Sequence, residues 1–147
     1  MKPGLLGSDW FEALGRRMGA EAEAFRRLGY IETRFVVRVL PEGETEDGTG
    51  TCTGLAFDGY TLSEAKPLPE PWSFDPDFVI CGRESAWSRM LDEIERNGRP
   101  ELRHTLNSLV LLGDELWLES SDQLREDKFY RYNQSLQEFF NLAVGSH

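Results

Sequence analysis

His104 is the residue best suited to acid–base chemistry, because it is the only histidine outside the last three residues of the chain. Glu101 lies three residues before it, and residues at this spacing share one face of a helix. A general acid–base dyad is therefore geometrically possible. No nucleophile or group of metal ligands accompanies the pair in the sequence, so the pattern favours a hydrogen-bonded histidine over a catalytic one.

The other reactive residue types do not match the spacing of a known site. The serines lie outside any Gly-x-Ser-x-Gly sequence, and the glycines between Gly48 and Gly54 lack the lysine and the helix of a phosphate-binding loop. Cys52 and Cys81 have neither CxxC spacing nor clustered histidines, which indicates reduced structural thiols. We therefore expect no catalytic residue, no metal site and no cofactor.

The composition disfavours several classes of partner. The 147 residues include 16 basic and 26 acidic side chains, a net charge of -10, so attraction to nucleic acid is unfavourable. The sequence has no transmembrane segment, which needs about 18 or more apolar residues, and no secretory signal, so we expect a cytoplasmic protein. Residues 1–144 are expected to form one domain, and residues 145–147 resemble the start of an expression tag.

Apolar residues at three- and four-residue spacing predict three amphipathic helices. The first follows the N-cap candidate Ser8 and ends near Gly29. The second follows Gly82 and ends at Asn97-Gly98, and the third begins after the N-cap candidate Asp122. A short further helix is expected from Pro100, since proline fits the first helical turn.

Three strands are expected in the first half of the chain. Residues 33–40 and 51–58 alternate as half-buried strands do. The polar loop between them, residues 41–50, lacks the ligand spacing of a calcium-binding loop. Asp58-Gly59 predicts a two-residue hairpin turn, so a third strand should start at Tyr60 and run antiparallel to the second.

The second half should complete an α+β fold. Four prolines in residues 67–76 predict an extended connection, and residues 78–80 a fourth strand. Residues 109–112 are apolar on both faces and predict a central strand covered on both sides. Residues 115–120 fit either the return limb of a hairpin or the start of a helix, and the hairpin is favoured. The expected sheet has about five strands, is largely antiparallel and is covered by helices.

Aromatic residues are abundant, with four tryptophans, four tyrosines and nine phenylalanines. Any single ring is most simply explained as part of the core. Together, however, several aromatic or methionine-bearing helix faces directed at one small sheet can leave an apolar tunnel between them. The sequence therefore favours holding an apolar molecule over transforming one.

The order of elements and several short motifs resemble the sterol carrier protein type-two lipid-binding domain over residues 9–114. The motifs are DFVICG from Asp77, AWSRML with Trp87 and Leu91, NGRP with Gly98 and Pro100, and SLVLLGD with Gly113 and Asp114. The Asp58-Gly59 turn also lies where this family turns between central strands. Asn107-Ser108 replaces the Gly-Lys pair common in the family.

The resemblance implies non-covalent binding or transfer of a sterol, fatty acid or acyl-CoA in an apolar tunnel, without cofactor or catalysis. The residues expected to line the tunnel come from a wall, a floor and a capping helix. They are Trp87, Met90 and Leu91 on the wall, Leu109 and Leu111 on the floor, and Phe129, Tyr132, Phe139 and Phe140 on the final helix.

Two other hypotheses remain open. The same fold could be a protein–protein interaction or accessory domain, in which the final helix packs between the subunits of a homodimer. It could also be a small cyclase- or isomerase-like enzyme that uses His104 and Asp114 in a pocket.

Overall fold

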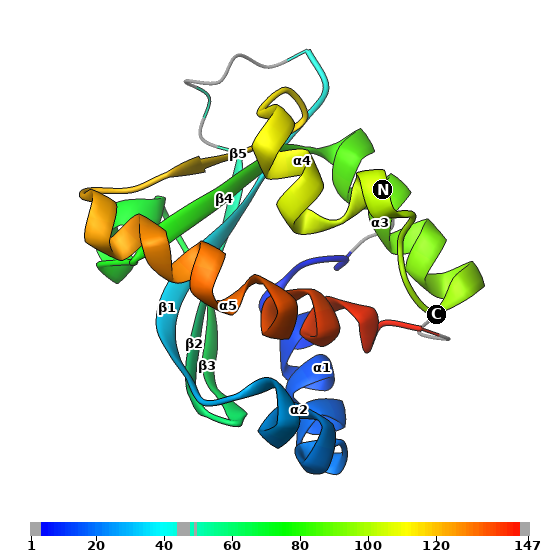
Figure 1. Cartoon of the computed structure of the whole chain (residues 1–147). Coiled ribbons are helices and arrows are strands. Elements are labelled where there is room, and N and C mark those ends of the chain that lie inside the picture. Colours follow the sequence, from blue (N-terminus) through cyan, green and yellow to red (C-terminus); the bar gives the residue numbers. More distant parts are fainter. Residues whose placement is uncertain (1–3, 44–47, 49, 145–147) are drawn as a thin grey trace.

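The computed structural model describes residues 4–43, 48 and 50–144, which form five helices, two short 3-10 turns and five strands (Figure 1). The helices are α1 (Ser8–Ala20), α2 (Ala22–Leu28), α3 (Glu84–Asn97), α4 (Leu106–Leu112) and α5 (Gln123–Asn141). The strands are β1 (Ile31–Leu40), β2 (Thr51–Gly59), β3 (Thr61–Leu68), β4 (Phe78–Arg83) and β5 (Leu116–Glu119). The 3-10 turns are η1 (Pro71–Phe74) and η2 (Leu102–His104). The predicted loop at residues 41–50 lies partly outside the described residues, and the predicted tag at residues 145–147 lies wholly outside them.

The strands form one sheet in the order β3-β2-β1-β4-β5. All neighbouring pairs are antiparallel except β1 and β4, which are parallel. After β3, at one edge of the sheet, the chain passes through η1 and enters β4 on the other side of β1. Because of this crossover, β4 runs parallel to β1. The predicted α+β fold with a five-stranded, largely antiparallel sheet is confirmed.

The predicted hairpin joins β2 to β3, where Gly59 has a φ of 81° and Asp58 pairs with Thr61. The proline segment is less extended than expected, because β3 continues through Pro67 and η1 follows. Proline is tolerated in β3 because this strand lies at the edge of the sheet, where a missing N–H breaks no ladder. The Glu70 side chain accepts a 2.9 Å hydrogen bond from the Trp72 N–H and caps η1.

The predicted strand at residues 109–112 is wrong, because this segment lies in α4. Thr105 caps the helix by accepting a hydrogen bond from the Ser108 N–H, and Gly113 ends it with a φ of 76°. Leu109 is buried, whereas Leu111 is 70% exposed, since a helix turns neighbouring residues to different faces. The strand at residues 115–120 is present as β5, but it pairs with β4 instead of returning from a hairpin.

Two other helix predictions need correction. The leading helix is broken at Glu21, whose φ of -107° and ψ of 29° leave the helical region, so α1 and α2 are separate. Pro100 precedes η2 instead of starting a helix, and η2 and α4 are separate elements. The other predicted helices appear as α3, which ends at Gly98, and α5, whose N-cap is Asp122.

The helices gather on one face of the sheet (Figure 1) and enclose the larger apolar cluster with Phe35, Phe57 and Phe78 from the strands. The opposite face carries a smaller cluster in which η1 covers the sheet. Its members are Val36, Cys52, Phe74, Val79 and Cys81. Both cysteines are buried, and neither forms a disulfide. No helix in the described part of the chain is both long enough and apolar enough to cross a membrane.

Candidate functional site

The interface between α5 and the sheet is the candidate ligand site, because most of the predicted lining residues belong to the apolar cluster that includes it. The larger apolar cluster contains seven of the nine. They are Trp87, Met90, Leu91, Leu109, Phe129, Phe139 and Phe140, each no more than 6% exposed. Tyr132 packs half-buried at the margin of this cluster, whereas Leu111 points away from it.

Three phenylalanines of α5 make the contacts with the opposing layers. Phe129 lies edge-on to Phe78 of β4, with 5.6 Å between ring centroids. Phe139 lies edge-on to Phe57 of β2 at 4.9 Å. Phe140 stacks on Trp87 of α3 at 5.8 Å. The apolar face of α5 therefore occupies the space that the sequence assigns to the tunnel.

Four further rings, which are not among the nine predicted lining residues, belong to the same site. Phe11 of α1 contacts both Phe139 and Phe140, at centroid distances of 6.3 and 5.8 Å. The other three rings are Phe35, Phe57 and Phe78 on the inward face of the sheet. The alternation of the strands already indicated which residues face inward. Which helix would lie opposite them depends on tertiary packing.

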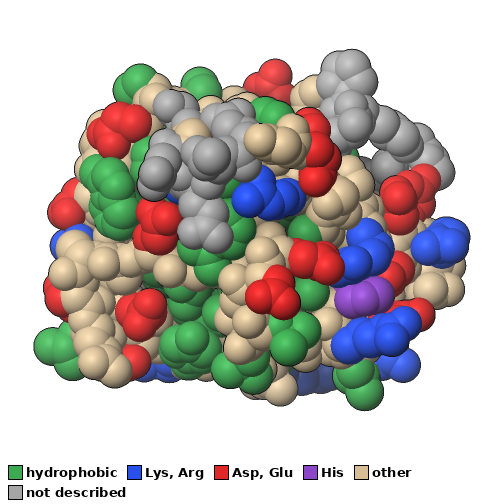
Figure 2. Space-filling model, turned by 90° about the horizontal axis from the view of Figure 1, so that it is seen from above, with side chains coloured by type: hydrophobic (Ala, Val, Ile, Leu, Met, Phe, Trp, Pro, Cys, Tyr) green, Lys and Arg blue, Asp and Glu red, His purple; other side chains and the backbone are tan. Residues whose placement is uncertain are grey.

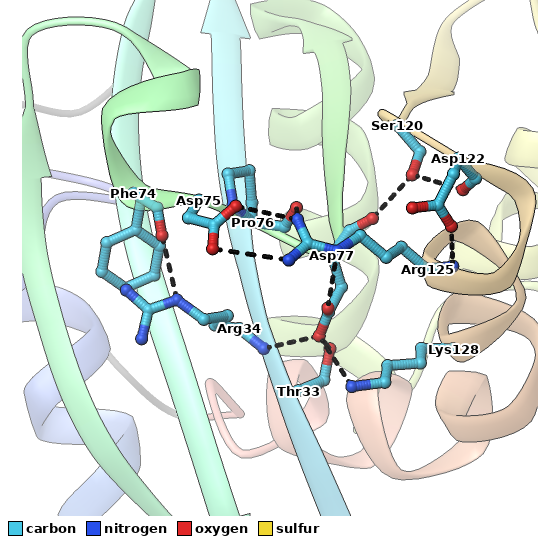
Figure 3. A network of polar contacts seen from close by, with 10 residues as sticks. All are labelled: Thr33, Arg34, Phe74, Asp75, Pro76, Asp77, Ser120, Asp122, Arg125 and Lys128. Atoms are coloured by element: carbon cyan, nitrogen blue, oxygen red, sulfur yellow. Dashed lines mark hydrogen bonds and ion pairs between the residues drawn. The ribbon is translucent and has the colours of Figure 1, made fainter.

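A buried polar network fastens the N-terminal end of α5 to the sheet (Figure 3). Asp77, 6% exposed, accepts hydrogen bonds at Oδ2 from the Thr33 hydroxyl at 2.9 Å and from the Arg34 N–H at 3.1 Å. Lys128 Nζ of α5 lies 3.2 Å from the same oxygen. The network joins β1, the start of β4 and α5, so it fixes where α5 begins its path across the sheet.

A second, more exposed ion pair supports this anchor. Arg125 of α5 donates to both carboxylate oxygens of Asp75, at 2.9 and 3.4 Å, and to the Pro76 carbonyl. These hydrogen bonds and the charge of Arg125 hold the pKa of Asp75 below its usual value. Asp122 caps the same helix end by accepting from the Arg125 N–H at 2.9 Å.

The C-terminal end of α5 is held differently, by exposed contacts. Arg17 Nη1 donates to the Leu142 carbonyl at 2.5 Å and to the Val144 carbonyl at 3.2 Å. Neutral acceptors exposed to water contribute less than a buried carboxylate does. The polar contacts at the two ends of α5 therefore differ in strength, and the weaker ones lie at the end that carries Phe139 and Phe140.

A groove of about 820 Å³ lies on the outer side of α5, between this helix and the segment from Arg99 to Asn107. Its lining mixes apolar side chains with carboxamides, among them Gln137, whose Oε1 accepts a 2.8 Å hydrogen bond from the Leu106 N–H. None of the nine predicted lining residues borders this groove. It is thus distinct from the interface between α5 and the sheet.

His104 pairs with Glu93, a residue outside the predicted dyad. Its Nδ1 lies 2.7 Å from Oε2 of Glu93 on α3 and 3.8 Å from Oε2 of Glu101, the expected dyad partner. Burial acts to raise the pKa of Glu93, but hydrogen bonds from the Glu101 N–H and His104 lower it below its usual value. Asp114, the partner in the enzyme hypothesis, is exposed in the turn between α4 and β5.

Solved structures of sterol carrier proteins have the same fold. The solution structure of a conserved hypothetical protein from Thermus thermophilus, described as a candidate sterol carrier protein, matches with a TM-score of 0.65 and 23% identity, over 93% of this chain and 85% of that one. A crystal structure of sterol carrier protein 2 matches with a TM-score of 0.63 and 23% identity, over 92% and 94% of the two chains. Apo sterol carrier protein 2 from Yarrowia lipolytica matches at 0.51 and 11% identity, over 99% and 98%.

The chain therefore has a sterol-carrier-protein-like fold, as the sequence motifs predict. At these identities the likeness concerns the fold. No protein-family model and no curated protein matches the sequence.

Proposed function

We propose that this protein binds a hydrophobic ligand, such as a sterol, fatty acid or acyl-CoA, non-covalently and without catalysing a reaction. The observation that carries the proposal is the fold, which is shared with sterol carrier protein structures over more than nine-tenths of the chain. The apolar cluster between the sheet, α3 and α5 supports it, because a ligand there would replace one apolar surface with another. No charged anchor is required.

The ligand must take the place of aromatic side chains, since the rings of α5 fill the interface. We propose that the C-terminal half of α5, which carries Phe139 and Phe140, moves outward to admit it. The polar contacts of this half are the exposed hydrogen bonds of Arg17, whereas the buried Asp77 network keeps the other end in place. Burying roughly 300 to 400 Å² of ligand at about 25 cal/mol per Å² would gain roughly 8 to 10 kcal/mol, from which unpacking and association costs are subtracted.

Titration with a fluorescent fatty acid and a fluorescent sterol tests this proposal. Phe140→Leu should tighten binding roughly four- to fifteenfold, because one or two methylene-sized groups, at about 0.8 kcal/mol each, no longer have to be displaced. Phe74→Leu is the matched control, since Phe74 is equally buried but lies in the cluster on the other face of the sheet. Absence of saturable binding in all three folded proteins would contradict the proposal.

The dense packing of this interface supports a second candidate, an interaction or accessory domain. In that case the rings of α5 form a permanent core, and the fold presents its outer surfaces to a partner protein or to a second copy of the chain. A homodimer in solution, together with no probe binding by the wild type or by Phe140→Leu, would favour this candidate. Light scattering measures the mass of the protein in solution and so detects a homodimer.

A further inference from the structure

We infer that Glu93, Glu101 and His104 form a binding site for a divalent transition metal, with Zn²⁺ as the best match. One ligand-type atom from each side chain lies within 4.8 Å of the other two. The inference is independent of the proposed lipid binding, because these residues lie outside the interface between α5 and the sheet.

The turn after α3 brings the three residues together. Gly98, with a φ of 83°, ends α3 and reverses the chain, and η2 then returns His104 to the helix that carries Glu93. The backbone N–H of His104 donates to the Glu101 carbonyl at 2.8 Å, which fixes the turn. His104 follows Glu93 by 11 positions, so the sequence alone does not show them as a cluster.

The site has a buried floor and an exposed rim. The side chains of Glu93, His104 and Glu101 are 8%, 15% and 54% exposed, respectively. In Figure 2 the histidine, coloured purple, lies at the surface beside acidic and basic side chains. A metal ion can therefore enter from solvent while Glu93 holds it from below.

The two distances from His104 to the carboxylates need only a small adjustment to accept a metal. Zinc bonds of about 2.0 to 2.2 Å in tetrahedral geometry place two ligand atoms roughly 3.3 to 3.5 Å apart. His104 Nδ1 now lies 2.7 Å from Glu93 Oε2 and 3.8 Å from Glu101 Oε2, on either side of that range. The ion would replace the proton that Nδ1 and Glu93 share, and the exposed Glu101 side chain has room to close the longer distance.

The chemistry of the donors fits the same metal. Two carboxylates balance a double positive charge, and imidazole combined with carboxylate is a common ligand set for zinc. Glu93 Oε1 accepts a 2.8 Å hydrogen bond from the Glu101 N–H, which orients the carboxylate and leaves Oε2 for the ion. Three protein ligands leave a fourth position for water.

Two arginines compete with the ion. Arg103 Nε lies 3.0 Å from Glu101 Oε2, but its side chain is 78% exposed, so it can turn into solvent at little cost. Arg89 adds a positive charge near Glu93, although its guanidinium is already paired with Glu115. The alternative explanation of the cluster is a hydrogen-bonded turn that binds no metal.

Metal titration of the chelator-treated protein separates the two explanations. Zn²⁺ followed by calorimetry and Co²⁺ followed by visible absorption should each bind in a 1:1 ratio, with a tetrahedral spectrum for Co²⁺. His104→Ala and Glu93→Gln should weaken binding about tenfold or more. Glu101→Gln should also weaken it, and this exposed substitution does not threaten folding.

Asp92→Asn is the matched control, because it removes a carboxylate from an exposed position of α3 beside Glu93. It should leave the affinity unchanged. No stoichiometric binding by the wild type, or binding that is equally tight in His104→Ala and Glu101→Gln, would overturn the inference. The second result would place the metal elsewhere on the chain.

Discussion

The carboxylate of Asp77 connects residues that are far apart in the sequence, since its partners Thr33, Arg34 and Lys128 come from β1 and α5. A buried carboxylate with three donors is stabilising only while all of them remain in place. Removing the charge of Asp77 takes away the ion-pair partner of Lys128. It also leaves the Thr33 hydroxyl and the Arg34 N–H with a weaker hydrogen-bond acceptor. The anchor of α5 is thus concentrated in one side chain.

Asp77→Asn is expected to lower the free energy of unfolding by about 1 to 3 kcal/mol. The measurement is urea denaturation followed by circular dichroism. Asp75→Asn is the control, because the Asp75 side chain is 80% exposed and its ion pair with Arg125 should contribute only about 0 to 1 kcal/mol. Equal effects of the two substitutions would show that the buried network does not anchor α5.

Cys81 provides a second test at the residue scale. Burial, reinforced by the charge of Glu119, raises the pKa of its thiol to about 12 from a usual value of 9.0. The folded protein should therefore resist alkylation by iodoacetamide at neutral pH and react once urea unfolds it. Because the folded pKa is the higher one, stability should fall as the pH rises above 9.0. Rapid alkylation of native Cys81, detected by mass spectrometry, would contradict the described burial.

At the scale of elements, α5 is the helix that determines what the apolar interior can hold. Its phenylalanines meet the sheet, α1 and α3, so α5 closes the interior against each of these layers. The same contacts stabilise the fold and oppose ligand entry. Under the proposed function, a hydrophobic ligand is accepted only if it restores most of the contacts that it displaces.

Phe139→Ala is expected to lower the free energy of unfolding by about 3 to 5 kcal/mol, because it opens a cavity between α1, β2 and α5. Leu124→Ala on the same helix is the control, since Leu124 is 82% exposed and its loss should change stability by at most about 0.5 kcal/mol. Thermal and urea unfolding measure the stability of both variants. A small effect of Phe139→Ala would mean that the end of α5 is already loosely packed.

Elements with a local signal could be predicted from the sequence, and those decided by context could not. The Gly98 helix end and the Asp122 cap each act within a few residues, and each was found. The predicted hairpin after Asp58 was also found, but Asp58 pairs with Thr61, so its turn lies one residue later, at Gly59-Tyr60. Residues 109–112 are apolar in every position, so their pattern does not separate a strand from a helix. The caps Thr105 and Gly113 decide for the helix.

The candidate site also combines residues that a local pattern identifies with residues whose position depends on tertiary packing. Seven of the nine predicted residues meet in one cluster because amphipathic patterns identify inward faces. Leu111 was misplaced together with the strand that contained it, since a helix turns it outward. The proximity of Glu93 to His104 depends on how the chain turns after Gly98, which no residue periodicity specifies.

At the scale of the whole molecule, one layer of helices covers one face of a five-stranded sheet (Figure 1). The interior of this layer is apolar, whereas the groove on the outer side of α5 is lined by both polar and apolar side chains. The sterol-carrier-like fold is compatible with either a carrier or an accessory domain. The difference between them is whether the packing of α5 yields to a ligand.

Native mass spectrometry of freshly purified protein tests that difference most directly. The proposed function predicts a species heavier than the bare chain by the mass of a lipid, which is released when the protein is unfolded, and a larger bound fraction for Phe140→Leu than for Phe74→Leu. The bare chain alone in all three proteins, even after incubation with sterols, fatty acids and acyl-CoA, would contradict hydrophobic ligand binding.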